Sequence, residues 1–208
     1  MLGESVLSPP VSPDKMSLMK KLLAIIILSL CFITSSKADD IRDFQIEGMS
    51  VGDSLLNFYD KKTIKKHYQN YYKDKKFSTF EIDLNKSETY DGLQVVYKSK
   101  DPKYIIHSIS GSVDCPYKFS KCEKAWQKIL PELDGMFKKN SKRIDKGTTN
   151  HEADKSKKSK VTMIVYEFYS KNRVSIEMTN WSKEIGYIDN LRISVDTKEF
   201  VEWLFTAY

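Results

Sequence analysis

The chain has 208 residues, with 34 Lys plus Arg against 28 Asp plus Glu and a formal net charge of +6 at pH 7. Hydrophobic residues make up 40% and aromatic residues 12%, a composition that excludes a disordered or collagen-like chain. Only four of the basic residues are Arg: Arg42, Arg143, Arg173 and Arg192. Because Arg is the residue that recognises bases and phosphates with paired hydrogen bonds, we expect no sequence-specific nucleic-acid partner.

The N-terminal segment, residues 1–38, has the pattern of a secretory signal peptide preceded by an extension. Two Lys precede a twelve-residue segment, 22–33, that is apolar except for Ser29, and the small residues Ser36 and Ala38 follow. A transmembrane helix needs about 20 apolar residues, so we expect no membrane span in the mature chain. We predict cleavage between Ala38 and Asp39 and a periplasmic or secreted protein.

Two questions about this segment stay open. Residues 1–18 are longer than a usual signal-peptide start, so translation begins at Met1, at Met16 or at Met19. Cys31 raises the alternative of lipid attachment. The residue before it is Leu30 rather than a small residue, which favours a cysteine that is simply part of the apolar run.

The remaining residues, 39–208, are enough for one domain with its own core. They contain two cysteines, Cys115 and Cys122, with six residues between them. A redox-active pair usually has two intervening residues, and zinc would need two further ligands nearby. In an oxidising compartment this pair predicts one structural disulfide.

Hydrophobic periodicity predicts helices in the segments 51–58, 60–66, 120–137 and 197–204. Asp60 is the expected N-cap of the second helix, and Ser120, with Glu123 three residues later, is the expected N-cap of the third. Pro131 should kink or break the third of these near residues 127–130. Alternating apolar residues predict strands at 77–84, 93–98, 104–113, 161–169, 173–179 and 191–196. Because the strands occur in runs, the expected fold is α+β: an antiparallel sheet of about six strands with helices packed on one face.

The order of a Gly48-Met49-Ser50 helix start, three strands and another helix resembles the small α+β modules of outer-membrane assembly lipoproteins and β-lactamase-inhibitor-like proteins. This resemblance covers roughly residues 46–113. The use of Lys, Ile, Asn and Tyr is also similar to that of uncharacterised secreted proteins of AT-rich Gram-negative bacteria. Neither resemblance implies particular catalytic residues.

Residues 138–160 differ sharply in composition from the rest of the mature chain. They hold nine basic and three acidic residues, and only Ile144 and Ala153 are apolar. This pattern predicts a mobile basic loop within the single domain. A second basic cluster, residues 60–76, has seven Lys interleaved with Tyr. Both clusters could contact a polyanionic envelope component, and the alternative is a solvated surface.

The sequence shows no motif for catalysis, a cofactor or a metal ion. It has no nucleophile elbow and no zinc-protease motif. His151, Glu152 and Asp154 lie close together, but their spacing and the Lys residues beside them do not favour a metal site. Pairs such as Glu81 and Asp83 fall on the outer face of a predicted strand.

We therefore predict an exported, non-catalytic binding or envelope-associated module. Trp181 and Tyr187 lie in a polar segment after a strand, where aromatic rings can form a binding platform. Lys157 and Lys158 are the candidate residues of the basic loop. Two alternatives remain: a periplasmic hydrolase whose carboxylates converge only in the fold, and an assembly or inhibitor module that binds a protein partner.

Overall fold

The computed structural model describes residues 41–207 except residues 86 and 117. The predicted signal peptide, its cleavage site and Cys31 lie outside these residues. The elements are the short 3-10 helices η1 (Ile41–Asp43) and η2 (Leu55–Asn57), the α-helices α2 (Lys61–Lys66), α3 (Ser120–Phe137) and α4 (Lys198–Leu204), and the strands β1 (Tyr68–Gln69), β2 (Phe77–Asp83), β3 (Gly92–Lys98), β4 (Ile106–Asp114), β5 (Ser141–Asn150), β6 (Lys160–Phe168), β7 (Arg173–Asn180) and β8 (Asn190–Asp196).

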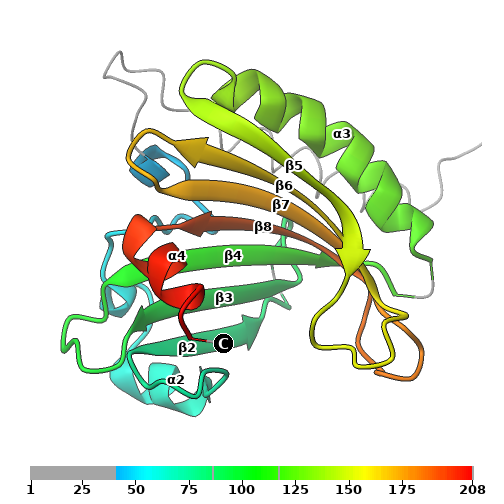
Figure 1. The fold of residues 1–208 in the computed structure, drawn as a ribbon. Helices are drawn as coiled ribbons and strands as arrows, with labels where there is room; N and C mark the ends of the chain where they lie inside the picture. The colour runs from blue at the N-terminus through cyan, green and yellow to red at the C-terminus, as the bar shows by residue number, and fades with distance from the viewer. Residues whose placement is uncertain (1–40, 86, 117, 208) are drawn as a thin grey trace, which may run out of the picture.

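All eight strands form one antiparallel sheet in the order β1-β2-β3-β4-β8-β7-β6-β5 (Figure 1). Each half of the chain forms a four-stranded meander, and the two meanders join where β4 pairs with β8. The order is symmetric about this central pair, so the first strand of each meander lies at an outer edge. The α+β prediction is confirmed at this level.

The prediction of six strands was too low, because β1 and β5 were missed. Both are edge strands, and β5 occupies much of the segment that was predicted to be a basic loop. Nine of its ten residues are polar or Gly, and eight are exposed, so no apolar alternation marks it as a strand. Basic side chains on an exposed edge also discourage pairing with another chain, which is a physical reason for this composition.

The main core lies between one face of the sheet and α3. Ala125, Ile129 and Leu133 of α3 pack there with apolar residues from β2–β4 and β6–β8. The residues 41–64 cover the rest of this face through side chains such as Met49 and Leu55. The helix is continuous through Pro131, so the break that the sequence allowed does not occur. Its buried stripe offsets a proline cost of about 3 kcal/mol.

The helix α4 packs on the opposite face, so the prediction that all helices share one face was wrong. Val95 of β3 belongs to the main core, whereas the next residue, Val96, packs with Phe200 and Trp203 of α4. Successive side chains of a strand point to opposite faces, which places α4 across the sheet from α3. Figure 1 shows α4 lying across β4 and β8 on the side toward the viewer.

Helix starts were predicted with mixed success. Asp60 caps α2 as expected, because its Oδ1 accepts a hydrogen bond from Thr63 N at 2.6 Å. The segment 51–58 forms only the short 3-10 helix η2 rather than a longer helix. Ser120 was predicted to cap α3, but Phe119 occupies the cap position and no side chain accepts a hydrogen bond there.

Cys115 and Cys122 form a disulfide with Cα atoms 5.8 Å apart, as predicted. Both cysteines are buried in the main core. The bond joins the residue after β4 to the first turn of α3, so it holds the start of this helix against the sheet. Within residues 41–207, with the two gaps, no helix is both long and apolar enough to cross a membrane.

Removal of the disulfide should destabilise the protein. The chain-entropy model gives about 2 to 3 kcal/mol for closing a loop this short. We therefore expect a Cys115→Ser, Cys122→Ser double variant to lose about that much free energy of unfolding in urea titrations. Non-reducing mass spectrometry of the wild-type protein should find the bridged peptide 2 Da lighter than its reduced form. Unchanged stability in the double variant would contradict this role.

Asp196, at the end of β8, should make stability depend on pH. Its Oδ1 accepts a hydrogen bond from Ser108 Oγ at 2.6 Å, but loss of hydration raises its pKa from 3.8 to about 6. The folded state therefore holds the proton more tightly than the unfolded chain, so this group's contribution to stability falls as the pH rises from about 4 to 6.

The variant Asp196→Asn removes this titration. Wild type loses this stabilisation as the pH rises, and the variant does not. The free energy of unfolding of the variant relative to wild type should therefore increase by up to about 3 kcal/mol between pH 4 and pH 6 and stay constant above pH 6. Urea titrations of both proteins at pH 4.5, 5.5 and 7 measure the difference. Parallel pH profiles would show that Asp196 titrates normally.

Candidate functional site

The face of the sheet that carries α4 has a polar region beyond the helix, which we call the polar face. Glu81 of β2 lies directly opposite Gln94 of β3, and Gln94 lies opposite Ser110 of β4. One step along, Arg192 of β8 lies opposite Glu177 of β7. These polar side chains come from both meanders, and the β4–β8 pairing brings them onto one surface.

A cleft of about 540 Å³ opens on the polar face, at the end of the sheet away from α4. Its floor is formed by Glu81, Gln94, Ser110 and Arg192, and its rim by aromatic residues of two loops. Gly92 keeps part of the floor open, since a Cβ there would lie 2.7 Å from Ser112 Oγ. The volume lies within the range of about 300 to 1,000 Å³ that is typical of small-molecule sites.

Glu81 is held in place by two hydrogen bonds to one of its oxygens. Tyr71 Oη donates to Glu81 Oε2 at 2.8 Å, and Gln94 Nε2 donates to the same oxygen at 2.7 Å. Burial, followed by this contact with the carboxylate, raises the pKa of Tyr71 to about 12. The phenol is therefore neutral at physiological pH and remains a hydrogen-bond donor.

The aromatic rim comes from the connection between β7 and β8. Trp181 and Tyr187 meet edge to face, with ring centroids 4.9 Å apart. The ring of His151, from the β5–β6 connection, also packs against Trp181, with ring centroids 4.2 Å apart. Tyr187 is 63% exposed and Tyr71 is 51% exposed, so both rings present apolar surface at the mouth of the cleft.

Two neighbouring loops support this rim, and Figure 1 shows the β5–β6 and β7–β8 connections extending together from the sheet. Asp154 is buried and accepts hydrogen bonds from Ser159 N and Ser159 Oγ, at 2.8 and 2.7 Å. Ser159 Oγ in turn accepts a hydrogen bond from Ser182 N at 2.9 Å. These hydrogen bonds thus connect Asp154 of the β5–β6 connection, through Ser159, to Ser182, the residue after Trp181.

Asp189 connects the rim to the disulfide region. Its Oδ1 accepts a hydrogen bond from Trp181 N at 2.7 Å, and its backbone carbonyl accepts one from Cys115 N at 2.7 Å. One residue therefore holds both the start of the aromatic loop and the end of β4. Asp189 thereby links the backbone at Trp181 to Cys115, which the disulfide joins to Cys122.

The structure brings Trp181 and Tyr187 together at the cleft, where both belong to the lining. Lys157 and Lys158 lie elsewhere on the exposed tip of the β5–β6 connection. Lys157 has a positive φ of 61° in this turn, and Lys158 forms an ion pair with Glu184 of the neighbouring loop. The two Lys residues therefore do not contribute to the cleft.

His151 and Asp154 have structural partners. His151 packs on Trp181, and Asp154 organises the turn. No cluster of three or more metal-binding side chains occurs among the described residues.

Sequence reasoning missed Tyr71, Gln94 and Arg192. These residues are far apart along the chain, and each occupies an unremarkable position in its own segment. Contacts between distant segments show that they share a site: the strand register places Gln94 opposite Glu81, Tyr71 donates a hydrogen bond to Glu81, and Arg192 lines the same cleft.

Comparison of the chain with protein-family models, with curated proteins and with solved structures gives no match. The function must therefore be argued from the geometry of the site.

Proposed function

We propose that this chain is an exported, non-catalytic binding module whose polar-face cleft binds a saccharide. One observation carries the proposal: exposed aromatic rings at the mouth of the cleft face a floor of fixed hydrogen-bonding groups. Tyr71 and Tyr187 line the mouth, and Glu81, Gln94 and Arg192 form the floor. The predicted signal peptide and the disulfide support export.

The exposed rings favour a ligand with weakly polar C–H surfaces. The face of an aromatic ring carries negative charge density, and the C–H groups on one side of a sugar ring are slightly positive. Stacking therefore stabilises a sugar against a ring without a fully apolar pocket. Tyr187 presents such a ring, and its contact with Trp181 fixes its orientation.

The floor offers the donors and acceptors that neighbouring hydroxyl groups require. Gln94 and Arg192 supply amide and guanidinium N–H donors, and Glu81 supplies carboxylate acceptors. The bonds from Tyr71 and Gln94 hold the Glu81 carboxylate in one orientation, so little side-chain entropy is lost on binding. A planar, pre-oriented carboxylate can accept hydrogen bonds from two adjacent hydroxyls.

The charge of the cleft argues against a polyanion at this site. Glu81, Asp83 and Asp114 line it together with one basic residue, Arg192. Three acidic groups against one Arg disfavour a phosphate or carboxylate ligand. A neutral or amino sugar fits this balance, and any polyanionic partner should bind elsewhere on the surface.

The same three carboxylates support a second candidate, a hydrolase that acts on the bound saccharide. Hydrolysis of a glycosidic bond requires two carboxyl groups on opposite sides of the bond. Incubation with the oligosaccharide that binds, followed by product analysis, separates the two functions. Products released by wild type but not by Glu81→Gln would establish the hydrolase, and an intact oligosaccharide would support binding alone.

The binding proposal predicts a specific loss in the variant Tyr187→Ala. Binding is measured by the change in tryptophan fluorescence on titration with oligosaccharides of glucose, mannose, galactose or N-acetylglucosamine. We expect one of these four series to change the fluorescence of wild type. The variant should bind that series about 5- to 30-fold more weakly, as expected for losing a stacked ring worth about 1 to 2 kcal/mol.

Tyr169→Ala is the matched control, because Tyr169 is 79% exposed but lies in the β6–β7 turn at the other end of these strands. It should bind as tightly as wild type. Equal losses in both variants, or no binding to any series, would contradict the proposal.

A further inference from the structure

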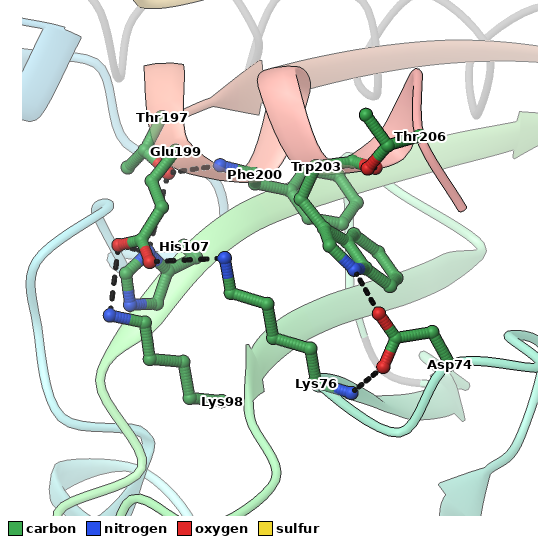
Figure 2. A network of polar contacts seen from close by, with 9 residues as sticks. All are labelled: Asp74, Lys76, Lys98, His107, Thr197, Glu199, Phe200, Trp203 and Thr206. Atoms are coloured by element: carbon green, nitrogen blue, oxygen red, sulfur yellow. Dashed lines mark hydrogen bonds and ion pairs between the residues drawn. The ribbon is translucent and has the colours of Figure 1, made fainter.

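A second concave site lies at the opposite end of β3, about 20 Å from the cleft given the rise of an extended strand. This groove of about 870 Å³ is lined by Lys75, Lys76, Lys98 and Lys100 together with His107. We call it the lysine groove. Figure 2 shows part of it, with Lys76, Lys98 and His107 directed toward Glu199 of α4.

The register of β2 and β3 gathers these lysines from two distant segments. Phe77, the first residue of β2, lies opposite Lys98, the last residue of β3. Just beyond the strands, Ser99 N donates a hydrogen bond to the carbonyl of Lys76 at 3.0 Å. The pair 75–76 therefore enters the sheet beside the point where residues 98–100 leave it.

A β-bulge turns His107 into the same groove. Val96 pairs with Ser108 and Tyr97 pairs with Ile106, so His107 has no partner on β3. Its ring packs edge-on against Phe77, with centroids 5.3 Å apart, and its Nδ1 lies 3.3 Å from Thr197 Oγ1. Bulges commonly redirect a side chain in this way. Burial lowers the pKa of His107, which favours the neutral ring.

Two of the acidic residues near the lysines are occupied by other donors. Asp74 accepts hydrogen bonds from Trp203 Nε1 and Lys76 N, each at 2.9 Å, and Figure 2 shows the first of these. Asp101 accepts from Lys103 N at 2.9 Å and from Ile105 N at 3.0 Å. These carboxylates hold the loop backbones and the indole in place.

Glu199 is therefore the main carboxylate that contacts the ammonium groups. Its Oε2 lies 2.9 Å from Lys98 Nζ, and its Oε1 lies 3.6 Å from Lys76 Nζ. Lys75 and Lys100 form no ion pair with any residue in the described part of the chain. The groove thus holds more positive charge than its own acids neutralise.

We propose that the lysine groove binds a phosphate-class oxyanion, a phosphoester or a pyrophosphate, between Lys75, Lys76, Lys98 and Lys100. Each ammonium group is a compact charge with three donors, which suits the oxygens of phosphate. A concave site with one sign of charge also concentrates the field that attracts such a ligand. Glu199 contacts two of the same ammonium groups, so it competes with the bound anion.

The test uses inorganic pyrophosphate and isothermal titration of the full chain at low ionic strength. We expect wild type to bind pyrophosphate and the double variant Lys98→Gln, Lys100→Gln to bind it at least about tenfold more weakly. The variant Glu199→Gln should bind about three- to fivefold more tightly, because it removes the competing carboxylate.

Two matched controls separate the groove from net charge. Glu202→Gln removes the same charge from α4 at a residue that pairs with Lys198, and the double variant Lys124→Gln, Lys128→Gln removes two exposed Lys from α3. Both should bind pyrophosphate like wild type. Absence of binding by wild type, or equal effects of the groove and control variants, would overturn the proposal. An unchanged affinity of Glu199→Gln for pyrophosphate would contradict the claim that Glu199 competes with the bound anion.

Flotation with vesicles identifies the source of the phosphate. If the ligand is an anionic lipid headgroup, the protein should float with phosphatidylglycerol vesicles but not with phosphatidylcholine vesicles. Loss of this flotation in Lys98→Gln, Lys100→Gln then assigns the groove to such a headgroup. Pyrophosphate binding without retention on either vesicle assigns it to a soluble phosphoester. Saccharide binding at the cleft is measured separately, so either proposal can fail without the other.

Discussion

The pairing of β4 with β8 is the interaction on which the rest of the structure depends. It runs from Ser108 opposite Asp196 to Asp114 opposite Asn190 and joins two four-stranded meanders. Without it, each meander would expose a central edge of unpaired backbone groups. With it, one continuous sheet has a face for the main core and α3 and an opposite face for α4. The same pairing places Arg192 beside Ser112, which makes the cleft a joint product of both halves.

The aromatic rim depends on a short series of hydrogen bonds rather than on a large apolar core. Asp189 accepts from both Trp181 N and Cys115 N, and Ser159 links the two loops through Ser182. Fixed loops of this kind reduce the entropy that a ligand must overcome, since binding residues are most often carried by loops on a rigid scaffold. The His151–Asp154 segment, whose spacing did not favour a metal site, supports this rim.

The overall positive charge is distributed unevenly, and its distribution separates two kinds of ligand. The most basic segment, residues 138–160, includes the edge strand β5, where exposed basic side chains protect the edge, and the connections on either side of it. The cleft is acidic, and the lysine groove is basic. The sequence suggested a polyanionic partner for the basic clusters 60–76 and 138–160. The lysine groove that we propose for an oxyanion takes Lys75 and Lys76 from the first cluster, whereas the aromatic platform around Trp181 borders the acidic cleft.

The sequence by itself determined the features that depend on local patterns. Alternating apolar residues located six strands, the Asp60 cap located α2, and the spacing of Cys115 and Cys122 predicted their bond. It could not locate β5, because an edge strand that buries no side-chain face has no apolar period. Nor could it place α4 on the face of the sheet opposite α3, or bring Tyr71 and Tyr187 to the same cleft. Those results depend on strand register and on the β4–β8 pairing, which are contacts between segments with no shared local pattern, and only the tertiary structure decides them.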